Sequence, residues 1–261
     1  MSKFKAVVFD WAGTVIDFGS FAPMGVFVKA FARFGVEATI AEARAPMGMA
    51  KWDHIKAMMT APALAERWKA AHGAYPTDAD VDRVYEVFVP MNEEVVAEFA
   101  TLVPGAKEAI DSLRARGLKI GSTTGYTRSI MTRVLPVAAA QGYVTDNLIC
   151  ADEVKEGRPS PLGMYQCFID LGVHPAAAVI KVDDTEPGIG EGVAAGCLTV
   201  GVTLSGNIAG RTPEELAALS PAEIEAIRAE AGARLKAAGA DYLIDTVADL
   251  PALIERLEAG A

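Results

Sequence analysis

The chain has 261 residues, of which 51% are hydrophobic and 22% charged, so it can bury a sizeable core and is not a disordered chain. Its net charge of −10, from 24 basic and 34 acidic residues, argues against a nucleic-acid partner, because binding to a phosphate backbone requires a basic surface. No apolar stretch reaches the roughly 18 residues that a membrane span needs, so we expect no membrane association. The three cysteines show no CxxC spacing, and no apolar leader is recognisable, which favours a reduced, cytoplasmic setting.

Short apolar runs that end at turn residues predict the strands of a parallel sheet. Several of these runs are apolar at consecutive positions, as expected for strands that helices cover on both faces. The predicted strands are residues 6–9, 118–123, 148–149, 179–182, 198–202 and 242–244. Helical patterns lie between them, including two that begin at the predicted N-caps Thr212 and Ser220. This alternation predicts a doubly wound, Rossmann-like α/β domain.

One segment interrupts the alternation of strands and helices. After residue 20 the sequence shows no convincing strand for almost eighty residues, only helical patterns at 26–34, 51–59, 64–71 and 79–97. We therefore predict an all-helical domain, residues 20–98, inserted into an α/β core domain formed by residues 1–19 and 99–261. Hinges are expected where the two parts join, near residues 19–20 and 98–104.

Side chains that can take part in catalysis follow several of the predicted strands. Asp10 ends the first strand, and residues 122–126, Ser-Thr-Thr-Gly-Tyr, end the second. Lys155 and Arg158 lie in the loop after the third strand, and Asp184 ends the fourth. Ligands of open α/β sheets bind at the carboxyl ends of the strands, so these groups should lie close together. Carboxylates, hydroxyls and a cation in one place suit phosphoryl transfer with a nucleophilic carboxylate and Mg²⁺.

The order of these motifs resembles that of the haloacid dehalogenase (HAD) superfamily. The four motifs are DWAGT, STTG, the loop with Arg158, and VDDT, and the helical insertion matches the superfamily's cap after motif one. Within the superfamily, the segments FAPM, EARAPMGMAKWDHI, GSTTGYTR and GRPSP resemble the phosphonoacetaldehyde hydrolases, or phosphonatases. The resemblance covers the whole chain. It implies a hydrolase that cleaves the carbon–phosphorus bond of phosphonoacetaldehyde in the degradation of 2-aminoethylphosphonate.

Position 12 separates ester chemistry from phosphonate chemistry. HAD phosphatases carry a second Asp two residues after the nucleophile, where it protonates the leaving alkoxide, and this chain has Ala12 there. A phosphonate has no bridging ester oxygen, so an acid at this position would have no leaving oxygen to protonate. The departing carbon needs an electron acceptor instead. An amine supplies one by forming an imine with the substrate aldehyde.

The resemblance also implies roles for individual residues. Lys51 would form the Schiff base and Asp10 would attack phosphorus to give an aspartyl phosphate, while Asp10, the Ala12 backbone carbonyl and Asp184 would bind Mg²⁺. Arg158 would hold the phosphonate oxygens bidentately, and a closed cap would lower the pKa of Lys51 by burial. The remaining residues implied to bind or support the substrate are Thr124, Gly125, Tyr126, His54 and Met47.

The family resemblance further implies a homodimer joined through the caps. The apolar helix at residues 26–34 is a candidate for the surface that a second subunit would bury. A monomeric mass in light scattering would contradict this expectation.

Some alternatives stay open at this point. Many superfamily members carry a further acid four residues after the motif-four Asp, where this chain has Gly188, and either Asp183 or Glu186 could supply that charge. A HAD phosphomonoesterase or phosphomutase would need the acid that Ala12 replaces, and borohydride would not inactivate it in the presence of substrate. A dehalogenase would be insensitive to EDTA. A non-catalytic HAD fold would bind phosphorylated ligands without turnover.

Overall fold

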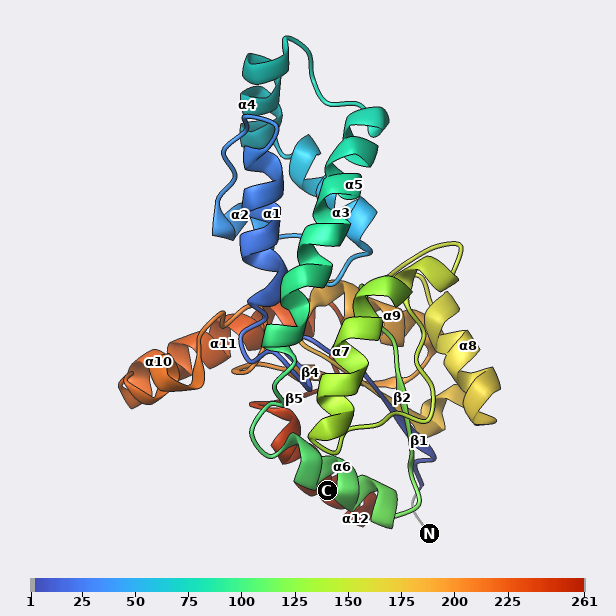
Figure 1. The fold of residues 1–261 in the computed structure, drawn as a ribbon. Coiled ribbons are helices and arrows are strands. Elements are labelled where there is room, and N and C mark those ends of the chain that lie inside the picture. Colours follow the sequence, from blue (N-terminus) through green and yellow to red (C-terminus); the bar gives the residue numbers. More distant parts are fainter. Residues whose placement is uncertain (1–2, 261) are drawn as a thin grey trace.

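The computed structural model describes residues 3–260 and contains a five-stranded parallel sheet (Figure 1). The strand order is β2-β1-β3-β4-β5, and every neighbouring pair is parallel. The chain therefore builds the sheet outward in both directions from β1, which confirms the predicted doubly wound α/β fold. The strands are β1 (Ala6–Phe9), β2 (Lys119–Ser122), β3 (Val179–Asp183), β4 (Leu198–Val202) and β5 (Tyr242–Ile244).

The strand predicted at residues 148–149 is wrong. Ile149 makes one isolated parallel bridge to Thr123, and its amide donates to the Ser122 carbonyl at 2.9 Å. Two apolar residues are too few to continue this bridge into a ladder, so the segment only borders the end of β2. The other predicted strands are present; β2 is shorter than expected and β3 is one residue longer.

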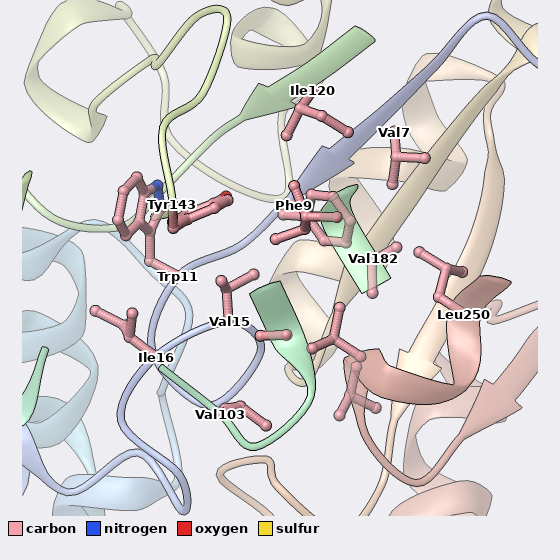
Figure 2. Close-up of a cluster of buried hydrophobic side chains, with 14 of the residues drawn as sticks. Val7, Phe9, Trp11, Val15, Ile16, Val103, Ile120, Tyr143, Val182 and Leu250 are labelled. Carbon is pink, nitrogen blue, oxygen red and sulfur yellow. The ribbon is translucent and has the colours of Figure 1, made fainter. Parts of the chain in front are cut away.

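Alternate residues of β1 face opposite sides of the sheet, as the period of a strand requires. Val7 and Phe9 belong to a large hydrophobic cluster on one face (Figure 2), whereas Ala6 and Val8 pack on the other. The first face is covered by α6 (Ala106–Ala115), α7 (Arg128–Ala140) and α12 (Leu250–Ala259). The second is covered by α8 (Leu162–Leu171), α9 (Glu186–Ala195) and α11 (Pro221–Ala237). Burial on both faces explains why the strand sequences are apolar at consecutive positions.

The predicted N-caps are present in the structure. The Thr212 side chain accepts a hydrogen bond from the Glu215 amide at the start of the short helix α10 (Pro213–Ala217), and Ser220 caps α11 in the same way through Glu223. Short 3₁₀ helices complete the fold: η1 (Val96–Phe99), η2 (Ala151–Glu153), η3 (Ala176–Ala178) and η4 (Val247–Asp249).

Five further helices gather at one end of the molecule, above the sheet (Figure 1). They are α1 (Ala22–Ala32), α2 (Ile40–Arg44), α3 (Lys51–Thr60), α4 (Pro62–His72) and α5 (Asp78–Val95). We call this helical body the cap. Its buried side chains form a hydrophobic cluster of their own that runs from Met24 to Phe88, and this separate core is what a distinct domain would have. The exact boundaries at residues 20 and 98 stay a prediction.

The apolar side chains of α1 are covered within the chain. Phe27 is fully buried and stacks on Phe88 of α5 with 4.2 Å between ring centroids, and Val26 and Phe31 are buried in the same cluster. The apolar character of this helix is therefore explained without a second subunit. Within residues 3–260, none of the helices combines the length and the apolar character needed to cross a lipid bilayer.

Candidate active site

Asp10 lies at the carboxyl edge of the sheet, where hydrogen bonds join the ends of three strands. Its amide donates to the Val182 carbonyl of β3 at 3.0 Å, and the Thr123 amide donates to the Phe9 carbonyl at 3.1 Å. Asp10 is therefore placed by the backbone of the two strands that flank β1.

The residue after Asp10 anchors this turn to the core. Trp11 is fully buried and packs edge-on against Tyr143, with 5.0 Å between ring centroids (Figure 2). Its indole Nε1–H donates to Ser122 Oγ at 3.0 Å, so the end of β1 is also tied to the end of β2 by side chains. Trp11 thus packs into the core, whereas Asp10 before it and Ala12 after it lie at a cavity above the edge of the sheet.

Three buried carboxylates cluster at this edge. One oxygen each from Asp10, Asp183 and Asp184 lies within 4.8 Å of the others. Burial, with the Asp183 charge as a second cause, raises the pKa of Asp10 to about 6, and burial and then the Asp10 charge raise the pKa of Asp184 well above its usual value. Burial also acts to raise the pKa of Asp183, but the positive charges of Lys181 and Arg158 outweigh it and lower that pKa.

Arg158 crosses the floor of the site. Its Nη1 donates to Asp10 Oδ1 at 2.7 Å, its Nε to Glu191 Oε2 at 3.0 Å, and its Nη2 to the Thr123 carbonyl and Oγ1 at 2.6 and 2.7 Å. A bidentate grip on a phosphonate would require Arg158 to release one of these contacts, so the expected role stays a prediction. Lys155, the other cation of this loop, is exposed and does not join the buried site.

Two buried charged residues beneath the site were not predicted. Lys181 of β3 lies 3.1 Å from Asp183 Oδ2 and 3.2 Å from Glu191 Oε2, and it donates to Thr123 Oγ1 at 2.7 Å. A lysine inside an otherwise apolar strand was the available signal, because a buried lysine needs partners. Glu191, one turn and a half into α9, carried no comparable signal in the sequence.

The charges of this network fit a divalent metal ion. Four buried carboxylates, those of Asp10, Asp183, Asp184 and Glu191, face two buried cations, Arg158 and Lys181. The ionised cluster therefore carries an excess of negative charge that a bound divalent cation would neutralise, and carboxylate oxygens are the ligands that hard cations take. The structure thus supports a metal site at the three clustered aspartates.

Asp184 is oriented by two further contacts. Thr14 Oγ1 donates to its Oδ1 at 3.0 Å and the Asn207 amide donates to its Oδ2 at 2.7 Å. Glu186, the other acid considered for the position that Gly188 leaves without a charge, instead contacts Arg234 at 2.6 Å. Of the two candidates, only Asp183 lies in the carboxylate cluster.

A small cavity separates the carboxylate cluster from the cap. It has a volume of about 20 Å³, and Lys51 from the cap and Asp10 from the sheet both line it. The other lining residues are Ala12, Ser20, Met47, Gly48, Thr124, Gly125, Tyr126, Arg158 and Thr185. The structure therefore brings most of the predicted site residues together at this cavity, with Asp184 next to Asp10 in the carboxylate cluster and His54 outside the lining.

Lys51 is the first residue of α3 and is buried to all but 3% of its surface. Its Nζ lies over the faces of two aromatic rings, 4.8 Å from the centroid of Tyr126 and 5.7 Å from that of Phe27. Burial lowers the pKa of Lys51 to about 8; the Asp10 charge opposes this shift and the Arg158 charge adds to it. The amine is therefore partly neutral, and thus nucleophilic, close to neutral pH.

His54 packs behind Lys51 in the cap rather than lining the cavity. Its Nε2 lies 2.8 Å from the Ala43 carbonyl, which can only accept, so Nε2 carries the proton and Nδ1 does not. The ring stacks on Phe27 with 4.0 Å between centroids. Burial and then the Lys51 charge hold the pKa of His54 well below its usual value, so the ring is neutral. A part in proton transfer stays a prediction.

Comparison with known proteins identifies the family. Residues 4–196 match the model of haloacid dehalogenase-like hydrolases. The chain is 50% identical over 259 residues to the phosphonoacetaldehyde hydrolase of Paraburkholderia xenovorans (strain LB400), with 99% of this chain and 97% of that one covered. The chain belongs to the phosphonoacetaldehyde hydrolase family.

Other members of the phosphonoacetaldehyde hydrolase family are nearly as similar. The enzyme of that name from Bordetella pertussis (strain Tohama I) is 48% identical over 256 residues, covering 98% of this chain and 93% of its own. A crystal structure of a phosphonoacetaldehyde hydrolase-like protein from Oleispira antarctica superposes with a TM-score of 0.96 at 42% identity, covering 98% of this chain and 93% of that one. This chain therefore shares its sequence and fold with these relatives over nearly its whole length.

Proposed function

We propose that this chain is a phosphonoacetaldehyde hydrolase, which converts phosphonoacetaldehyde and water into acetaldehyde and phosphate during the degradation of phosphonates such as 2-aminoethylphosphonate. The observation that carries the proposal is the cavity between cap and sheet, where a buried amine of lowered pKa, Lys51, shares the space with the carboxyl of Asp10. The presence of Ala12, where an ester hydrolase needs an acid, supports the same reaction.

The reaction begins at Lys51. Its neutral amine adds to the aldehyde carbon, and loss of water leaves a protonated imine. Asp10 then attacks phosphorus opposite the P–C bond, whose electron pair moves into the imine. The products of this step are an enamine on Lys51 and an aspartyl phosphate at Asp10. The aromatic faces of Tyr126 and Phe27, which lie beside Lys51 Nζ, stabilise the positive charge of the protonated imine.

Two hydrolyses complete the cycle. The enamine is protonated at carbon, and water releases acetaldehyde and the free Lys51 amine. A second water cleaves the aspartyl phosphate and restores Asp10. One water is released when the imine forms and two are consumed afterwards, so one water is consumed overall.

The remaining site residues bind and neutralise the phosphonate. We infer that Asp10, the Ala12 carbonyl and Asp184 hold Mg²⁺, which when bound supplies positive charge beside the phosphoryl group. Arg158, whose Nη1 lies beside Asp10, would hold the phosphonate oxygens bidentately after releasing one of its present contacts. Thr124, Gly125, Tyr126 and Met47 line the space around the substrate, and His54 supports Lys51 from behind.

We also propose a cytoplasmic homodimer joined through the caps, in keeping with the family resemblance. Three free, buried cysteines, Cys150, Cys167 and Cys197, agree with a reducing compartment. A monomeric mass in light scattering would contradict the dimer.

Lys51→Arg tests the proposed function. Arginine keeps the positive charge but cannot form an imine, so acetaldehyde release should fall by roughly 10³-fold or more, on the scale of losing a covalent catalytic residue. Borohydride should inactivate the wild type only when phosphonoacetaldehyde is present, with the reduced adduct found on Lys51 by mass spectrometry. The matched control is Lys56→Arg, a solvent-facing lysine of the same helix that pairs with Asp78.

The outcome separates the rival functions. Equal acetaldehyde release by Lys51→Arg and the wild type would reject the imine reaction. Insensitivity to borohydride, combined with hydrolysis of phosphate esters, would favour a phosphomonoesterase.

A further inference from the structure

The segment that leads into Lys51 touches the core on both sides of Asp10. A Cβ on Gly48 would lie 2.2 Å from Thr185 Oγ1, and a Cβ on Gly125 would lie 2.7 Å from the Met49 carbonyl oxygen. Cap and core are therefore in backbone-close contact here. We call residues 44–51 the docking loop, because they connect α2 to α3 and lie against the core.

Arg44 is the polar anchor at the start of the docking loop. Its Nη1 lies 2.9 Å from the Gly19 carbonyl oxygen, 3.0 Å from the Asn207 carbonyl oxygen and 3.1 Å from Asn207 Oδ1. Asn207 Nδ2 donates in return to the Arg44 carbonyl at 3.3 Å. The guanidinium also lies over the ring of Phe21, 5.0 Å from its centroid. Arg44 thus joins the cap to a core loop 163 residues further along the chain.

Asn207 also contacts the carboxylate cluster. Its amide donates to Asp184 Oδ2 at 2.7 Å, and a Cβ on the preceding Gly206 would lie only 2.5 Å from Asp184 Cβ. Ser205, two residues earlier, donates from Oγ to the Gly13 carbonyl at 2.9 Å. The loop that receives Arg44 is therefore packed directly on Asp184 and on the turn after Asp10.

We propose that Arg44 and Asn207 are positioning residues of the reaction, forming a latch that holds the docking loop, and with it the Lys51 amine, over Asp10 when the cap is closed. The proposal rests on the proposed function. Neither side chain lines the cavity, so each acts through the placement of another residue. Because a displacement of about 1 Å can slow a reaction by about 10²-fold, such contacts are sufficient to control the rate.

Alanine variants of both residues test the latch. Arg44→Ala removes all the hydrogen bonds that the guanidinium makes, whereas Asn207→Ala keeps the backbone amide that holds Asp184. We expect Arg44→Ala to lower kcat by about 10- to 100-fold and Asn207→Ala by less, both with slower borohydride trapping of the imine on Lys51. Both variants break the contact between Arg44 Nη1 and Asn207 Oδ1, and only Asn207→Ala breaks the bond to the Arg44 backbone carbonyl, so the fold-loss of the double variant should be smaller than the product of the two single losses. Arg33→Ala, at an exposed arginine of the cap, should match the wild type.

Further measurements separate positioning from simple loss of structure. Arg44→Lys retains a cationic donor and should recover part of kcat at an unchanged thermal midpoint. If Arg44→Ala does not fold, Arg44→Lys and Asn207→Ala carry the comparison with the wild type. Wild-type kcat and trapping rates in the variants, or fully additive losses in the double variant, would overturn the latch. Failure of the wild type itself to release acetaldehyde would instead refute the proposed function.

Discussion

At the scale of single residues, the proposed chemistry depends on an unusual environment for a lysine. A helical lysine normally faces solvent, yet Lys51 is buried between two aromatic rings at the boundary of cap and sheet. Removal from water disfavours the charged form, whereas the nearby carboxyl of Asp10 favours it. Burial is the larger of the two effects, so the pKa falls to about 8.

This environment predicts how activity depends on pH. Imine formation needs the neutral amine, so kcat/KM for phosphonoacetaldehyde should rise about tenfold per pH unit below 8 and level off above it. The measurement is acetaldehyde release between pH 6 and pH 9, with circular dichroism at each pH to show that the fold is kept. A profile that still rises tenfold per unit at pH 9 would mean that Lys51 has the pKa of an ordinary surface lysine, and a flat profile would mean that loss of a proton from this amine does not control the rate.

Single residues also show what the sequence could predict. Strand ends and a family motif mark Asp10, Asp184 and Lys51 in the sequence. In the structure Asp10 and Lys51 line one cavity, and Asp184 lies next to Asp10 in the carboxylate cluster. Glu191 and Asn207 were missed, because their roles arise from contacts between positions that are far apart in the chain. No local pattern in a single sequence reports such contacts.

At the scale of elements, the start of α9 is shaped around the carboxylate cluster. Thr185 caps the helix by accepting from the Gly188 amide at 3.3 Å, and its hydroxyl donates to Asp183 Oδ1 at 2.7 Å. A Cβ on Gly188 would lie 2.0 Å from Asp183 Cγ. The Asp183 carboxyl therefore fills the space that a side chain at position 188 would need. The position of the Asp183 side chain therefore requires a glycine at position 188.

Gly188→Ala should disturb the metal site. The added methyl group has to displace Asp183, and overpacking of this kind costs about 1–3 kcal/mol of unfolding free energy. We expect a lower urea midpoint and a smaller rise of the thermal midpoint on addition of Mg²⁺, since a bound ion stabilises the folded state.

Gly25→Ala is the matched control for this substitution. Gly25 also lies within a helix, α1, but a Cβ there meets no atom within 4 Å. Alanine should leave the response to Mg²⁺ unchanged and stabilise the fold by up to about 1 kcal/mol. An equal response of both variants to Mg²⁺ would contradict the contact between positions 183 and 188.

Elements were predicted well where burial imposes a pattern and poorly where it does not. Strands covered on both faces are largely apolar, so β1, β3 and β4 could be found from the sequence, and the short edge strand β5 was found from its apolar run. The pair Leu148–Ile149 has the same composition but lies at the margin of the sheet, where only one bridge forms. Composition alone does not tell a short buried loop from a short strand.

At the scale of the whole molecule, the structure shows the cap closed on the core. A cavity of about 20 Å³ has room for little more than one water molecule, so phosphonoacetaldehyde cannot enter without movement of the cap. The left-handed backbone at Asp17, Gly19 and Ser20, with φ of 52°, 88° and 54°, lies where the chain first passes from the sheet to the cap. We therefore expect substrate entry and product release both to depend on opening of the cap.

A disulfide across the closed interface tests this dependence. A Cβ on Gly157 would lie 3.1 Å from the Ala50 Cβ, a few tenths of an ångström shorter than the roughly 3.5–4.5 Å of disulfides. A small local shift would therefore let Ala50→Cys combined with Gly157→Cys lock the cap. The oxidised double variant should lose activity toward added substrate and regain it on reduction. Ala50→Cys alone, oxidised in the same way, controls for pairing with Cys150, which lies nearby. Full activity of the oxidised double variant would show that substrate enters without cap movement.

The placement of Lys51 and Asp10 on different parts of the chain divides the labour of bond cleavage. In the proposed reaction, the sheet binds the phosphorus end of the substrate and the cap binds the carbon end. Selection can therefore act on each end separately. A related protein with a different segment in place of the one that carries Lys51 would keep the Asp10 carboxylate as acceptor of the phosphoryl group. Its preference for the leaving group on phosphorus would change.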